Sequence, residues 1–248
     1  MRAILCYHSI DASGSVISVD PDVFRQQIAW LERSAVRVVP LDRLVESHDS
    51  GDAVALTFDD AFANFAETAW PVLRDAGLPA TVFAPTDHMG GWNDWVQPAH
   101  LRIPALPLMS WQVLARLTEE GVVVGSHTCT HPDLTTLPAA AIAGELEHSA
   151  DRIERETGRR PGALAYPFGA CDARVADVVA SRYRHACTTR LEPYHAADSR
   201  HELPRLDMYY FRRAGQLERW GSWRFDATLR ARRTARSARH VLLPGRSP

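Results

Sequence analysis

Two adjacent carboxylates, Asp59 and Asp60, directly follow an apolar run at residues 54–58. Side chains alternate between the two faces of a strand, so neighbours within a regular strand cannot enter the same pocket. At the end of a strand, where the backbone turns, they can. Two carboxylates held close together repel each other, and a cation that binds one of them relieves the repulsion. The pair therefore predicts a cation site at the end of a strand.

A second motif, HTCTH at residues 127–131, places two imidazoles four residues apart. At helical or turn spacing such a pair faces one side and suits a single metal ion. Alone this pattern is weak evidence. Combined with a carboxylate from another strand, His127 and His131 complete a two-histidine, one-carboxylate set that leaves positions open for water. Cys129, between them, is interpreted as a small buried spacer, with ligation of a soft ion as the alternative.

Short apolar runs alternate with longer amphipathic stretches along most of the chain. The runs lie at residues 3–6, 36–39, 54–58, 81–84, 122–124 and 163–166, and the helical stretches at 21–33, 64–75, 110–120, 138–157 and 172–183. This alternation predicts an α/β fold, a mainly parallel sheet wrapped by helices, either open or closed into a barrel. Chemistry in such folds collects at the carboxyl ends of the strands, which is where both motifs fall.

Composition bounds the class of protein. The 248 residues, 46% hydrophobic and 23% charged, are ordinary for a soluble globular chain of one large or two small domains. The charge is uneven: residues 211–248 contain ten Arg against Glu218 and Asp226, a charge of +8. An Arg-rich terminus suits an anionic membrane surface, although a solvated tail is the plainer interpretation. Nucleic acid is not expected as a partner, because the basic residues sit in one segment without a recognised motif.

The four cysteines, Cys6, Cys129, Cys171 and Cys187, show no CxxC spacing, and the chain opens without a signal-peptide pattern. No apolar run approaches the roughly 20 residues that a membrane helix needs. We therefore expect reduced thiols and a cytoplasmic protein, with membrane association through the basic segment left open.

Three motifs together resemble a known family. TFDD at 57–60, HTxxH at 127–131 and YPFG at 166–169 occur in the order and spacing of the polysaccharide deacetylases, carbohydrate esterase family 4, the NodB homology domain. The resemblance spans about residues 1–210, predicted as the catalytic domain, with 211–248 as an Arg-rich extension. It implies a single-domain distorted (β/α) barrel and metal-dependent removal of an acetyl group from a sugar.

The resemblance also implies roles for individual residues. Asp60, His127 and His131 fall on the metal ligands, and Asp59 falls on the catalytic base. The backbone N–H of Phe168 would help to stabilise the oxyanion. The substrate-binding candidates are the neighbouring motif residues and two tryptophans that could stack on sugar rings: Tyr166, Pro167, Trp92 and Trp95.

The catalytic acid does not follow the commonest pattern of the family. Many members supply it from a late Leu-x-His motif, which residues 202–208 lack. The opening LCYHSI instead resembles a permuted branch, with deacetylases of exopolysaccharide systems, in which an N-terminal Tyr-His pair carries the acid. His8 is then the acid, and Arg205 orients the base. Two positions depart from the pattern: Ala61 replaces a frequent Gly, and Ala165 stands where many members have an Arg that Arg205 would replace.

The ligand set suits Zn²⁺ and would also accept Co²⁺, Ni²⁺, Mn²⁺ or Fe²⁺. The expected substrate is an N-acetylated sugar on a glycolipid, oligosaccharide or small glycoside, and the basic segment favours a membrane-associated glycolipid. One alternative is hydrolysis of a non-sugar amide or a formyl group by the same site. A non-catalytic carbohydrate-binding barrel is less favoured, because an inactive relative should lack the base or a ligand and this chain has both.

Overall fold

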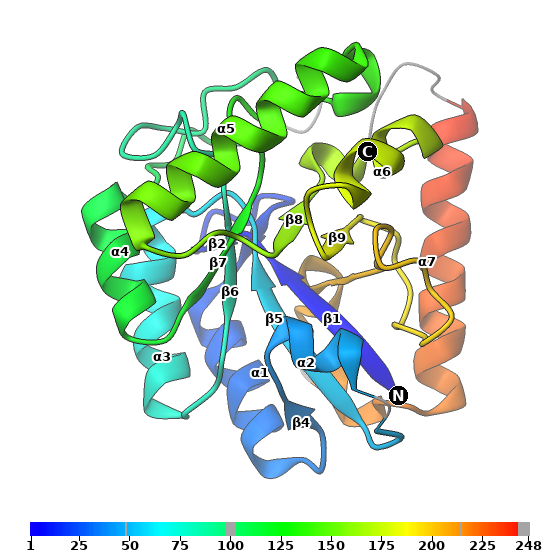
Figure 1. The fold of residues 1–248 in the computed structure, drawn as a ribbon. Coiled ribbons are helices and arrows are strands. Elements are labelled where there is room, and N and C mark those ends of the chain that lie inside the picture. Colours follow the sequence, from blue (N-terminus) through cyan, green and yellow to red (C-terminus); the bar gives the residue numbers. More distant parts are fainter. Residues whose placement is uncertain (48, 98–102, 214, 243–248) are drawn as a thin grey trace.

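The computed structural model describes residues 1–47, 49–97, 103–213 and 215–242 (Figure 1). Its centre is an eight-stranded parallel sheet in the order β10-β1-β5-β6-β7-β8-β9, with β4 paired to the start of β5. The strands are β1 (Arg2–Tyr7), β4 (Arg37–Val38), β5 (Ala53–Phe58), β6 (Thr81–Ala84), β7 (Val123–Ser126), β8 (Ala163–Ala165), β9 (His185–Cys187) and β10 (Leu206–Asp207). A separate pair, β2 (Ser9–Ile10) and β3 (Ser18–Val19), follows β1.

The two edges of this sheet come together around Leu203, three residues before β10. The Leu203 N–H donates to the Ala186 carbonyl of β9 at 2.8 Å, and the Thr188 N–H donates to the Leu203 carbonyl at 2.9 Å. Since β10 pairs with β1, the segment that leads into β10 bridges the far edge of the sheet to its beginning. The predicted distorted barrel is confirmed.

Helices cover the outside of the sheet (Figure 1). They are α1 (Pro21–Arg33), α2 (Leu41–Glu46), α3 (Trp70–Asp75), α4 (Trp111–Glu119), α5 (Ala139–Thr157), α6 (Ala173–Ala180) and α7 (Trp223–Leu242). A π-helical turn, η1 (Phe65–Ala69), precedes α3, and short 3₁₀ turns lie at η3 (Leu134–Thr136), η4 (Pro167–Gly169), η5 (Met208–Phe211) and η6 (Leu217–Arg219). Side-chain caps set two of these starts: Asp20 caps α1 and Ser110 caps α4.

Both faces of the central strands are buried, which explains why they read as continuous apolar runs. In β1, Leu5 packs in the large cluster beneath the outer helices, whereas the next residue back, Ile4, faces the barrel interior with Ala55 and Phe83. A third cluster lies under α5 and α6 and includes Leu164 of β8. The carboxyl ends of the strands are thereby held in a fixed arrangement.

The basic segment after residue 210 differs from a solvated tail. Phe211, Leu217, Phe225 and Leu229 are buried in the largest core cluster, and the Phe211 and Phe225 rings stack at 5.3 Å between centroids. Trp220 packs against Trp30 of α1 at 5.7 Å. Residues 211–229 therefore share the core of the barrel, and α7 runs along its side (Figure 1). Within the described chain, α7 included, no helix has the length and apolar character to cross a bilayer.

Candidate active site

Asp59 and Asp60 lie where β5 ends, and the backbone turns sharply there. The Asp59 N–H still donates to the Tyr7 carbonyl at 2.9 Å, continuing the pairing of β5 with β1. Asp60 and Ala61 then adopt left-handed conformations, with φ of 69° and 54°. Such angles are costly for residues other than glycine and cluster at functional sites. They allow two neighbouring carboxylates to enter the same region, as the sequence predicts.

Asp60 and the two histidines of HTCTH converge on one point. The Oδ1 atom of Asp60 lies 3.3 Å from Nε2 of His127 and 3.5 Å from Nε2 of His131, and the two Nε2 atoms are 3.2 Å apart. All three side chains are buried, and Oδ1 of Asp60 has no hydrogen-bond partner among the described residues. An orphaned carboxylate oxygen beside two imidazole nitrogens is a donor set that fits a divalent metal ion.

A backbone carbonyl orients the first histidine. Nδ1 of His127 lies 2.8 Å from the carbonyl oxygen of Ala165, at the end of β8. A carbonyl oxygen only accepts, so Nδ1 carries a proton, and Nε2, which faces Asp60, is the ring nitrogen that could bind a metal ion. The position where many family members have an Arg side chain thus contributes a backbone group here.

The HTCTH loop is fixed by Glu145 of α5, a residue that the sequence did not mark. Its carboxylate accepts from the Cys129 N–H at 2.8 Å, and from the N–H and hydroxyl of Thr130 at 3.0 and 2.8 Å. The Cys129 thiol points to the Glu145 carbonyl at 3.4 Å, and so it faces α5 and not the metal-ligand cluster. The spacer interpretation of Cys129 therefore fits the structure, and no sequence pattern could have linked Glu145 to this loop.

Burial and charge set the protonation of the cluster. Burial lowers the pKa of His131 to about 4, and the neighbouring His127 adds to this effect. Burial alone would raise the pKa of Asp60, but the two adjacent imidazoles outweigh it and hold the pKa well below its usual range. Burial disfavours the charged form of His127, yet the Asp60 carboxylate raises its pKa overall. An ionised Asp60 and a neutral His131 are already in the forms that bind metal.

Asp59 has an entirely different partner. The guanidinium of Arg205 donates to both carboxylate oxygens of Asp59, each at 2.7 Å, and its Nε donates to the Thr188 carbonyl at 2.9 Å. Arg205 is 1% exposed and fills the barrel interior over the Phe83 ring. Burial would raise the pKa of Asp59, but the positive charge of Arg205 outweighs it and lowers the pKa.

His8 and Cys6 reach Asp59 from β1. Nε2 of His8 lies 3.8 Å from Oδ2 of Asp59, and the imidazole is 22% exposed at the surface of the site. The Cys6 thiol lies 3.7 Å from the same oxygen. Burial raises the pKa of Cys6 despite the nearby Arg205, so the thiol keeps its proton. Cys6 was not expected near Asp59, although strand alternation places it on the same face as His8.

The YPFG segment contributes unequally. Phe168 takes a left-handed φ of 59°, and its ring lies 4.8 Å from the His131 ring. Pro167 is buried beside it. Tyr166 is 1% exposed, packs in the third core cluster, and donates its hydroxyl to the His201 carbonyl at 2.8 Å. Its side chain is therefore not presented to the metal-ligand cluster.

The two candidate tryptophans also separate. The Trp95 ring lies 4.3 Å from the His131 ring and 5.1 Å from His88, so it walls the metal-ligand cluster. Trp92 forms a bridge with Pro107 and leaves 53% of its surface exposed. The structure gives Trp92 no contact with the metal-ligand cluster among the residues it describes.

This chain is similar to known proteins in sequence and in fold. The family model for polysaccharide deacetylase matches residues 46–183. A chitin deacetylase from Colletotrichum lindemuthianum is 27% identical over 177 residues, which are 71% of this chain and 66% of that protein, and the chain covers 56% of a second curated relative, from Bacillus subtilis. Among solved structures, IcaB from Ammonifex degensii has a TM-score of 0.73 at 22% identity, covering 83% of this chain and 91% of its own. The deacetylase PplD from Streptococcus pyogenes has a TM-score of 0.71 at 22% identity, with the same coverage.

At 22% identity the solved structures show the fold alone, and family membership rests on the match to the family model. That match spans more than half of the chain and contains the TFDD, HTCTH and YPFG motifs. This chain belongs to the polysaccharide deacetylase family.

Proposed function

We propose that this chain is a metal-dependent hydrolase that removes the acetyl group from an N-acetylated sugar. The observation that carries the proposal is the pairing of two sites at the end of β5: a metal-ligand cluster around Asp60 and a buried, ionised carboxylate, Asp59, clamped by Arg205. Support for the substrate class comes from family membership and from a relative that is a chitin deacetylase.

Asp60, His127 and His131 would hold the ion. Two imidazoles and one carboxylate favour Zn²⁺ over harder ions, and this identity is part of the proposal. When bound, the ion supplies Lewis acidity toward the amide carbonyl and lowers the pKa of water beside it. The protein contributes a rigid, dry pocket in which the ligands are oriented before the ion arrives.

Asp59 acts as the general base. Its pKa is held below the ordinary value, so it is ionised at neutral pH, and Arg205 fixes both oxygens in one plane. A water molecule that attacks the acetyl carbonyl loses its proton to Asp59. The bidentate clamp means that the base does not have to reorganise during the reaction.

His8 acts as the general acid. The His8 imidazole is 22% exposed and the Asp59 side chain 3%, so His8 is the more accessible of the two. Imidazole exchanges protons near neutral pH, which suits protonation of the departing sugar amine. The Phe168 N–H, in the turn against His131, stabilises the negative charge that develops on the carbonyl oxygen. Trp95 forms the wall on which the sugar stacks.

The contact with an anionic membrane is a separate proposal. It draws support from Trp223, 74% exposed at the start of α7, and from Arg224, which stacks on the Trp223 ring. Other arginines of this segment are used within the domain, since Arg233 pairs with Glu192 at 2.7 Å. Co-sedimentation with vesicles of anionic lipid tests this contact, and equal recovery with neutral vesicles would refute it. The cytoplasmic location predicted from the sequence stays a prediction.

The test of the main proposal is acetate release from a panel of N-acetylated sugars: N-acetylglucosamine, its short oligomers and its glycolipid forms. We expect release that stops on chelation and returns when Zn²⁺ or Co²⁺ is added. Formylated sugars and non-sugar amides run in parallel. Release from these alone would favour the alternative substrates, and metal binding without release from any acyl compound would contradict the proposed activity.

A further inference from the structure

A second pocket, of about 540 Å³, lies at the same edge of the sheet as the candidate active site. β1 and β10 are adjacent parallel strands, with Cys6 opposite Asp207. Beyond its end β1 continues through His8 to Asp11, and β10 continues to Tyr209; both residues line the pocket. The pocket thus begins a few residues beyond the proposed acid on one strand and beyond Arg205 on the other.

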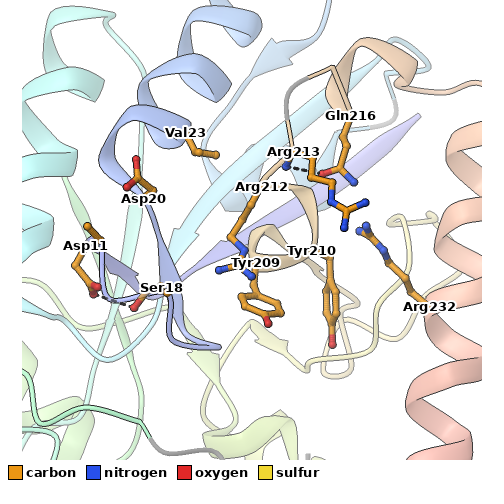
Figure 2. Close-up of a pocket in the computed structure, with 12 residues that line it drawn as sticks. Asp11, Ser18, Asp20, Val23, Tyr209, Tyr210, Arg212, Arg213, Gln216 and Arg232 are labelled. Carbon is orange, nitrogen blue, oxygen red and sulfur yellow. Dashed lines mark hydrogen bonds between the residues drawn. The ribbon is translucent and has the colours of Figure 1, made fainter.

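The two walls of this pocket carry opposite charges (Figure 2). One wall holds Asp11, Ser18 and Asp20, from the β2–β3 turn and the start of α1. The opposite wall comes from η5, the following loop and α7, and consists of Tyr209, Tyr210, Arg212, Arg213, Gln216 and Arg232.

The acidic wall is satisfied by its own neighbours. Asp11 accepts hydrogen bonds from the Ser9 and Ser18 hydroxyls and from the Ser13 N–H, which hold its pKa below the usual range against the effect of burial. Asp20 caps α1 by accepting from the Asp22 N–H at 2.8 Å. These carboxylates are committed to local structure, and within the described chain neither of them forms a salt bridge with the arginines opposite.

The arginines of the basic wall make no salt bridge within the described chain. Arg213 and Arg232 direct their guanidinium groups toward each other (Figure 2). Nη1 of Arg232 is buried without a hydrogen-bond partner, and within the described chain none of the salt bridges within 4.0 Å involves Arg212, Arg213 or Arg232. The negative charge of Asp207 acts on Arg232, and the Asp207 carboxylate also accepts from the Tyr209 N–H at 3.0 Å. Converging guanidinium groups repel each other unless an anion lies between them, and planar oxyanions match their donor geometry.

The same wall offers flat surfaces beside the charges. The Cζ atom of Arg212 lies 3.8 Å from the centroid of the Tyr209 ring, and that of Arg232 lies 5.4 Å from the Tyr210 ring. Such stacking holds the guanidinium planes in place and leaves their edges free to donate. An aromatic and guanidinium wall of this kind suits a sugar ring with an attached oxyanion.

We propose that this pocket is a subsite for an oxyanion, a phosphate or a carboxylate, carried by the saccharide on which the enzyme acts. Arg213 and Arg232 bind the oxyanion, and Tyr209 with Arg212 forms the floor for the ring that bears it. As a substrate subsite the assignment rests on the proposed deacetylase function, but the binding of an anionic sugar is a property of the pocket alone. It would select acidic or phosphorylated glycans over neutral ones.

Calorimetric titration of the metal-loaded protein with three non-acetylated sugars tests this assignment: glucose 1-phosphate, glucuronate and glucose. We expect the phosphate, the carboxylate or both to bind at least ~10-fold more tightly than glucose, since charge-assisted hydrogen bonds are worth about 1.5–3 kcal/mol each. Tighter binding of glucose 1-phosphate would identify the oxyanion as a phosphate, and tighter binding of glucuronate would identify it as a carboxylate. Arg213→Gln and Arg232→Gln should each weaken that binding by about 10-fold or more. Arg230→Gln, on the same helix and exposed outside the pocket, should not change it.

Asp60→Asn separates the pocket from the metal centre, because anions also bind metal ions. Anionic-sugar binding that persists in Asp60→Asn and is lost in either arginine variant supports the subsite. Binding that follows Asp60 and ignores both arginines overturns it, as does equal binding of all three sugars. Arg213 lies in a loop, so its variant remains informative if thermal melting shows that Arg232→Gln is misfolded. Anion binding without acetate release would refute the proposed activity but support the anion subsite. Acetate release without anion binding would support the activity but refute the subsite.

Discussion

The two adjacent carboxylates at the end of β5 have opposite surroundings. Asp59 meets a guanidinium that donates to both of its oxygens, so its charge is balanced by the protein itself. Asp60 meets two imidazoles, and its Oδ1 atom has no hydrogen-bond partner in the described part of the chain. Arg205 balances the charge of Asp59, and we propose that a cation balances the charge of Asp60. Neighbouring residues of the same type can thus be given a proton-transfer role and a metal-binding role by their partners alone.

The candidate site has two halves, which come from different parts of the chain. The metal half consists of Asp60, His127 and His131. It uses β5, β7 and the turns that follow them, all within the stretch that the family model matches. The half around Asp59 draws on β1 and on the segment before β10, so His8 and Arg205 lie outside that stretch. The pairing of β1 with both β5 and β10 brings His8 and Arg205 to the strand that carries Asp59.

The largest effect should come from breaking the metal half. Asp60→Asn removes the only anionic ligand of the cluster, so acetate release from the best sugar should fall to background in an assay of initial rates. Zn²⁺ should restore the chelated wild-type protein but not the variant. A variant that kept most of the wild-type rate would show that Asp60 does not hold the ion.

Removing the charge of Asp59 should leave metal binding intact but stop proton transfer to the base. Asp59→Asn should lower kcat by about 10²–10⁴-fold, the usual contribution of a general base. Circular dichroism provides the control for folding, since the change leaves the buried Arg205 without its carboxylate. An unchanged kcat would remove Asp59 from the role of base.

Arg205→Gln should sharpen the comparison through pH. Burial then dominates at Asp59, its pKa rises, and the acidic limb of kcat/KM moves to higher pH. Stability should fall by about 3–5 kcal/mol at neutral pH, as expected when one partner of a buried ion pair is removed. Because the pKa of Asp59 is depressed in the folded protein, this contribution is present above the unfolded pKa and disappears as pH falls through the folded one.

Denaturant unfolding at neutral and acidic pH measures that difference, and Arg205→Lys serves as the conservative comparison that keeps the charge. A stability loss of the same size at both pH values, with an unmoved acidic limb, would mean that Arg205 only fills space in the barrel.

The smallest effect is expected at the rim of the metal half. Trp95→Ala should raise KM about 2–10-fold with little change in kcat, since an aromatic stacking contact is worth about 0.5–1.5 kcal/mol. Trp92→Ala is the matched control, because Trp92 is half-exposed and makes no contact with the metal-ligand cluster in the described residues. Equal changes in both variants would argue against a specific sugar wall at Trp95.

The sequence predicted that Asp60, His127 and His131 would lie together, because these residues sit in short contiguous motifs at strand ends. TFDD and HTCTH each place their ligands within five residues, and the apolar runs before them set the strands. The buried helix faces were equally readable, and α1 has the predicted bounds, Pro21–Arg33. Local patterns carried this information because both periodicity and caps are local properties.

The residues around Asp59, His8 and Arg205, were expected only from the family resemblance and not from the residue pattern itself. His8 and Arg205 are isolated residues nearly two hundred positions apart, and their meeting at Asp59 depends on long-range strand pairing. β9 and β10 have three and two residues, too short to show a period. The Arg-rich composition after residue 210 hid the apolar positions, such as Phe225 and Leu229, that pack α7 onto the barrel.

Metal content after exhaustive dialysis, measured side by side in the wild-type protein, Asp59→Asn and Asp60→Asn, tests the division between the two carboxylates most directly. We expect one ion per chain in the wild type and in Asp59→Asn, and none in Asp60→Asn. Loss of the ion from both variants, or its retention in both, would contradict the assignment of one carboxylate to the metal and the other to the proton.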